Sequence, residues 1–91
     1  MSLKDLFEYI NENYNFQNLR IKTYPNDEKA IAFEDTKMKY VIFGPEDDWC
    51  LTEFDKITPS LQAGGFSTER LIERLCERQK GKIKEYELFK L

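Results

Sequence analysis

The residues with the clearest potential for chemistry are a cluster of carboxylates, Glu46, Asp47 and Asp48, followed by Glu53 and Asp55. Carboxylates can bind a divalent cation or share acid/base work. The spacing lacks the regular alternation and the closing glutamate of a calcium loop. With 17 Asp and Glu in 91 residues, some close pair arises by chance. We therefore expect no metal or catalytic site here, and we keep a small carboxylate- or metal-dependent enzyme as an alternative.

The remaining inventory for catalysis is small. The chain has no histidine, which removes the commonest general base and transition-metal ligand. Its two cysteines, Cys50 and Cys76, form no zinc-binding cluster. Gly64 and Gly65 precede a predicted helix, but without the lysine and spacing of a phosphate-binding loop. We expect no cofactor, and we predict that these glycines belong to a loop joining sheet to helix.

Three aromatic residues are candidates for contact with a partner, although a tryptophan at the start of a strand belongs to a core more often than to a surface. Trp49 follows the cluster directly, and Tyr24 and Tyr40 lie in strand-like segments. Large aromatic side chains dominate the energetics of many protein interfaces. If all three faced solvent, they would form an aromatic patch. The candidate partner-binding residues are Trp49, Tyr24, Tyr40, Glu46, Asp47 and Asp48.

Basic residues are concentrated near the end of the sequence. Residues 27–55 hold nine acidic and three basic residues, whereas residues 68–84 hold three acidic and six basic ones. The candidate nucleic-acid contacts in this basic segment are Arg70, Arg74, Arg78, Lys80, Lys82 and Lys84. Interleaved glutamates and a net charge of −3 oppose binding to phosphate. Nucleic-acid binding is therefore the alternative, and a self-paired helix face is the simpler interpretation.

The elements that position these residues can be predicted from periodicity. Residues 2–14 place apolar side chains at helical spacing, with Ser2 and Asp5 suited to a capping box. Strand patterns cover 19–24, 29–35, 38–43 and 49–54. The segment 38–43 is apolar on both faces, which predicts a central strand.

The second half of the chain is less regular. Residues 55–66 lack clear periodicity, and Ser67 is placed to cap a helix over about 68–80. Residues 82–90 return to a strand pattern. The order α-β-β-β-β-α-β over 1–91 predicts a single α+β domain. We expect a two-layer sandwich in which both helices pack on one face of a mainly antiparallel sheet.

Composition narrows the function without naming it. The sequence shows neither a membrane-spanning apolar run nor a secretory signal, so we expect a cytoplasmic protein. The leading hypothesis is a small acidic, non-catalytic protein-binding or regulatory module. Its partner would be another protein or a second copy of the chain, as in a homodimer. Size and charge are also typical of small bacterial or phage proteins.

Overall fold

The computed structural model describes residues 1–55 and 61–78, except for the side chains of residues 55, 61 and 62. The helix α1 spans Leu3–Asn13. The five strands are β1 (Gln17–Thr23), β2 (Lys29–Glu34), β3 (Met38–Phe43), β4 (Trp49–Asp55) and β5 (Leu61–Phe66). A second helix occupies residues 68–78 of the described chain.

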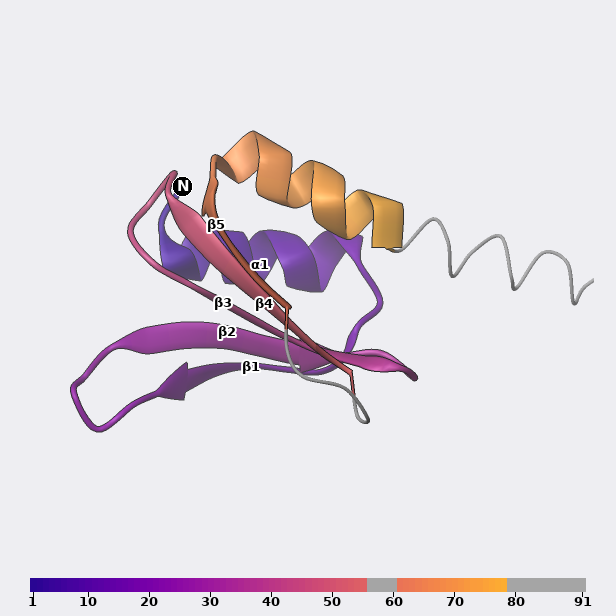
Figure 1. The fold of residues 1–91 in the computed structure, drawn as a ribbon, viewed down its shortest axis with the longest axis horizontal. Helices are drawn as coiled ribbons and strands as arrows, with labels where there is room; N and C mark the ends of the chain where they lie inside the picture. The colour runs from indigo at the N-terminus through magenta and orange to yellow at the C-terminus, as the bar shows by residue number, and fades with distance from the viewer. Residues whose placement is uncertain (56–60, 79–91) are drawn as a thin grey trace, which may run out of the picture.

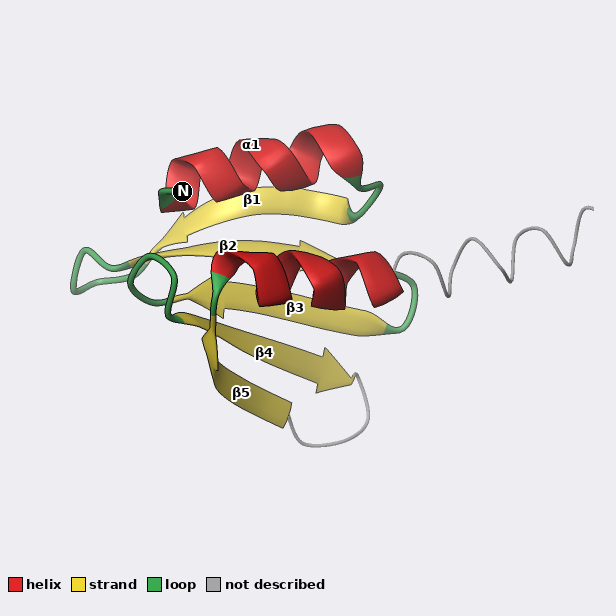
Figure 2. Ribbon diagram, turned by 90° about the horizontal axis from the view of Figure 1, so that it is seen from above, coloured by secondary structure: helices red, strands yellow, loops and turns green. Residues whose placement is uncertain are grey.

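The strands form one antiparallel sheet in the order β1-β2-β3-β4-β5, so each strand pairs with its neighbour in sequence. Short connections favour this arrangement. β3 lies at the centre, as its apolar character on both faces predicted. Figure 2 shows α1 above β1 and the second helix above β3, both on the same side of the sheet. Figure 1 shows the two resulting layers from the side.

Both helices begin with the caps that the sequence predicts. The Ser2 side chain accepts from the Asp5 amide, and the Asp5 carboxylate accepts from the Ser2 amide, which completes a capping box. Ser67 Oγ accepts from the Arg70 amide at the start of the second helix. These bonds satisfy amides that have no partner within a helix.

One face of the sheet, which we call the covered face, packs against the helices. Its buried side chains are Ile31, Phe33, Tyr40, Ile42, Trp49 and Leu51, together with Glu53. The helices contribute Leu6 and Ile10 from α1 and Leu71 and Leu75 from the second helix. The two-layer α+β sandwich is therefore confirmed, with a single core between the layers.

The prediction that Gly64 and Gly65 belong to a loop is wrong, because residues 61–66 form β5. The two residues Gly64 and Gly65 oppose the single residue Cys50 at a register shift between β4 and β5. Gly65 has φ +76°, a conformation that side chains with a Cβ rarely adopt. The glycines therefore serve a β-bulge inside a strand rather than a loop. The predicted strand over 82–90 lies outside the described residues.

The other edge strand carries a similar irregularity. The register between β1 and β2 shifts between Gln17 and Arg20, and Asn18 in this interval has φ 55°. Bulges of this kind twist an edge and discourage pairing with another chain. The two edges are therefore less suited to strand addition than straight edges would be.

Candidate functional site

The second face of the sheet has no layer over it in the described part of the chain, and we call it the open face. Cross-strand partners share a face, so the register places Ala32 with Val41 and Thr52, and Lys39 with Phe54. The side chains of the open face are Arg20, Lys22, Ala30, Ala32, Glu34, Lys39, Val41, Phe43, Cys50, Thr52 and Phe54. Tyr24 joins them from the end of β1.

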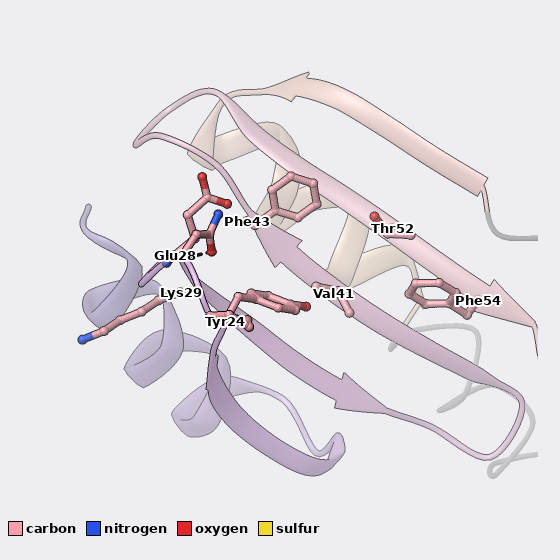
Figure 3. Close-up of a pocket in the computed structure, with 9 residues that line it drawn as sticks. Tyr24, Glu28, Lys29, Val41, Phe43, Thr52 and Phe54 are labelled. Carbon is pink, nitrogen blue, oxygen red and sulfur yellow. Dashed lines mark hydrogen bonds between the residues drawn. The ribbon is translucent and has the colours of Figure 1, made fainter.

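A groove of about 560 Å³ runs along this face. Its apolar lining comes from Tyr24, Pro25, Val41, Phe43 and Phe54. Figure 3 shows the ring of Tyr24 pointing toward Val41, with Phe43 on the same strand as Val41 and Phe54 on the next strand, β4. Tyr24 is 41% exposed and Phe54 38% exposed, although both are large and apolar.

A second depression of about 480 Å³ adjoins the groove and shares Tyr24, Val41 and Phe54 with it. Arg20, Lys22 and Lys39 line this part. Among the described residues, no ion pair is recorded for any of these three cations. Arg20 donates to the carbonyl oxygen of Asn18 at 2.8 Å, which leaves its charge uncompensated. The depression therefore combines apolar surface with three cations and one carboxylate, Glu34, and no ion pair joins them among the described residues.

The predicted aromatic patch does not form. Trp49 is 1% exposed and Tyr40 2% exposed, because the alternation of β3 and β4 turns both side chains toward the helices. Phe33 stacks on Tyr40 with ring centroids 5.0 Å apart. Of the three candidate aromatic residues, only Tyr24 reaches the surface, and Trp49 lies in the core.

The buried tyrosine hydroxyl still finds a polar partner. Tyr40 donates to the Asp35 carboxylate at 2.9 Å. Burial, followed by this hydrogen bond, raises the pKa of the Tyr40 hydroxyl above its ordinary value. Tyr40 therefore stays protonated and holds the turn between β2 and β3 against the core.

Asp47 in the acidic cluster acts as a structural cap. The Thr68 amide and hydroxyl both donate to the Asp47 carboxylate, and Trp49 Nε1 donates to Thr68 Oγ1 at 3.0 Å. The hydrogen bond from the Thr68 side chain, then that from its amide, holds the pKa of Asp47 below its usual value. Asp47 thus ties the β3–β4 turn to the start of the second helix.

The turn that carries the cluster is also fixed by its backbone. Gly44 has φ +115°, and a Cβ there would lie 3.0 Å from the carbonyl oxygen of Asp48. Glu46 forms an ion pair with the N-terminal amine of Met1. Two of the three carboxylates, Glu46 and Asp47, therefore have partners within the chain. A direct role of Glu46, Asp47 and Asp48 in partner binding stays a prediction.

Three arginines, Arg70, Arg74 and Arg78, follow one another at intervals of four residues along the second helix and form its arginine stripe. A carboxylate of the covered face neutralises part of this positive charge. Glu53 is 6% exposed, and it accepts from Arg78 Nη2 at 2.7 Å and from Arg74 Nε at 3.3 Å. Arg74 Nη1 also lies 4.0 Å from Glu77 Oε2, an ion pair between residues three apart on the same helix. Two of the three described arginines thus stabilise a buried carboxylate, which weakens the nucleic-acid alternative.

Arg70 is the remaining arginine of the stripe. It lines a small depression of about 200 Å³ with Phe66, Glu73, Arg74 and Glu77. The mixed charge of this depression suits a solvated helix face better than a phosphate site. Lys80, Lys82 and Lys84 lie outside the described residues, so contact of this segment with nucleic acid stays a prediction.

Within 1–55 and 61–78, no group of three or more His, Cys, Asp or Glu side chains is placed to hold a metal ion. No helix in this part of the chain is long and apolar enough to cross a membrane.

The open face contains residues that sequence reasoning missed, namely Val41, Phe43 and Phe54. A usable signal existed, since residues 38–43 are apolar on both faces. The pattern predicts a central strand, and it also places apolar side chains on a face that no described helix covers. Comparison of the chain with family models, with curated proteins and with solved structures finds no match.

Proposed function

We propose that the chain is a non-catalytic protein-binding module whose binding surface is the open face of the sheet. The observation that carries this proposal is the apolar groove on that face. The solvent-facing side of an antiparallel sheet usually carries polar residues. Here Val41, Phe43 and Phe54 take those positions.

The exposure of the groove also favours binding. Contiguous apolar patches on soluble proteins mark interaction sites, whereas isolated apolar residues do not. Tyr24, Val41, Phe43 and Phe54 line one continuous groove. Tyrosine and phenylalanine can bury a large area with few rotatable bonds, which makes them efficient anchors for a partner.

The rest of the described chain supports binding rather than catalysis. Glu46, Asp47 and Glu53 are engaged in contacts that stabilise the fold. The groove itself brings together apolar side chains, with Glu28 and Lys29 at its rim. Its chemistry suits recognition of apolar side chains.

Site-specific photo-crosslinking in the producing cell tests the proposal. A photoreactive phenylalanine analogue replaces Phe54 in one variant and Ile21 in another. Both residues are 38% exposed, but Ile21 pairs with Ile31 and lies on the opposite side of the sheet. We expect discrete protein adducts at position 54 and few at position 21. Equal adducts at both positions, or adducts at position 21 alone, would contradict the proposal.

A further inference from the structure

The charges around the groove identify the chemistry of its occupant. The residues lining the groove and the adjoining depression include four basic and two acidic side chains. They are Arg20, Lys22, Lys29, Lys39, Glu28 and Glu34. This surface is net positive, although the whole chain carries a net charge of −3. Within the described residues, this local excess of positive charge lies on the sheet face opposite the two helices.

Three of these cations lie next to apolar residues that line the groove. Arg20, Lys22 and Lys39 lie beside Phe54 and Val41. On the covered face, by contrast, Glu53 meets Arg74 and Arg78 from the second helix. No carboxylate forms an ion pair with the three open-face cations among the described residues. A partner with carboxylates beside its apolar side chains would supply the missing charges.

The shape of the surface favours a helix as the occupant. A sheet face has its backbone hydrogen bonds satisfied along the strands, so a partner adds to it through side chains rather than through strand pairing. The covered face already binds two amphipathic helices in this way. Helices on both faces of a sheet are a common architecture. An added helix would complete a third layer.

We propose that the open face binds an acidic amphipathic helix of a partner protein, with apolar residues in the groove and carboxylates against Arg20, Lys22 and Lys39. This inference rests on the proposed function and adds the chemistry of the partner. A second copy fits less well, because stacking two open faces would bring the same excess of positive charge together. Nucleic acid fits less well, because Glu28, Glu34 and the acidic remainder of the chain oppose phosphate.

A matched pair of peptides tests this inference on the intact chain. Both are synthetic helices of about 18 residues, or five turns. They share one face of Leu and Phe, and the flanking positions are Glu in one peptide and Lys in the other. Titration followed by amide NMR shifts gives both the affinity and the site. We expect the Glu peptide to bind about tenfold more tightly at low salt. Its shifts should centre on Val41, Phe43 and Phe54.

Charge-reversal variants locate the effect. Lys22→Glu with Lys39→Glu should weaken binding of the Glu peptide about tenfold and strengthen binding of the Lys peptide. Lys4→Glu is the control, because Lys4 is exposed on α1, which packs on the other face. It should leave both affinities unchanged. A dispersed amide spectrum for each variant shows that the fold is retained.

Each other outcome overturns the inference in a distinguishable way. If the Lys peptide binds the open face as well as the Glu peptide, the acidic partner is wrong and the proposed function stands. If neither peptide binds and light scattering shows a dimer with open-face contacts, the occupant is a second copy. If oligo(dT) or oligo(U) displaces the Glu peptide, both the inference and the proposed function fail. If neither peptide binds a monomeric chain, the inference fails, and the crosslinking experiment decides the proposed function separately.

Discussion

Both faces of the sheet carry large aromatic side chains, but the exposure of these side chains differs between the faces. On the covered face, Trp49 and Tyr40 are buried and each donates a hydrogen bond to a side chain. On the open face, Tyr24 and Phe54 remain about two-fifths exposed. The charges follow the same division. Glu53 pairs with Arg74 and Arg78 on the covered face, whereas Arg20, Lys22 and Lys39 have no recorded ion pair within the described residues.

The difference separates the residues that maintain the fold from the exposed residues to which we assign binding. On the covered face, Trp49, Tyr40 and Glu53 have partners within the chain. The open face carries apolar residues typical of an interface between layers, and no described element covers them. Substitutions should therefore separate stability from binding according to the face on which they fall.

The largest expected effect on stability is at Trp49 on the covered face. Trp49→Ala removes a fully buried ring and the Nε1 hydrogen bond to Thr68. We expect a loss of about 3–5 kcal/mol in the free energy of unfolding. Urea denaturation followed by circular dichroism measures it. A loss as small as that of an exposed residue would place Trp49 outside the core.

The second effect is at the buried carboxylate of the same face. Glu53→Gln removes the charge that holds Arg74 and Arg78. Because the arginines are partly exposed, we expect a moderate loss of about 1–3 kcal/mol by urea denaturation. Glu77→Gln is the matched control, since Glu77 is exposed and lies 4.0 Å from Arg74. Equal effects of the two changes would show that the buried pair has no special weight.

A smaller, pH-dependent effect is expected at Asp47. Hydrogen bonds from Thr68 lower the pKa of Asp47 in the folded chain below its ordinary value of 3.8. Its stabilising contribution is therefore present above that value and lost as the pH falls through the lower, folded pKa. Asp47→Asn should be less stable than the wild-type chain at pH 6, and the gap should narrow in strong acid. Thermal melts from pH 6 to about pH 2 measure the gap. A gap that is independent of pH would contradict the charged cap.

A smaller loss of stability than at Trp49 is expected on the open face. Phe54→Ser should lower the free energy of unfolding by about 1–2 kcal/mol, because the side chain is 38% exposed and only part of its apolar area is buried. The same change should abolish most binding of the Glu-flanked helical peptide in the NMR titration. A large loss of stability with unchanged binding would reverse the roles that we assign to the two faces.

Much of the fold could be predicted from the sequence, because local patterns and packing agree. The capping box at Ser2, the strand pattern of residues 38–43 and the cap at Ser67 all correspond to observed elements. The strand β5 was not predicted, because two consecutive glycines, Gly64 and Gly65, are typical of a loop. In the sheet these glycines form a bulge opposite Cys50.

The candidate site was harder to predict for a physical reason. The face on which a strand residue lies depends on alternation, but which face receives the helices depends on the whole sheet. Tyr40 and Trp49 could not be assigned to the covered face from their own segments. The face on which Phe54 lies follows from its pairing with Lys39, which the sequence of its own strand does not show.

The most direct test of the open face as a binding surface is hydroxyl-radical footprinting of the chain, purified and within the cell. Tyr24, Phe54 and Ile21 have similar exposure in the isolated chain. A partner on the open face predicts that Tyr24 and Phe54 become protected in the cell while Ile21 stays reactive. Unchanged reactivity of Tyr24 and Phe54, with or without protection of Ile21, would contradict the account.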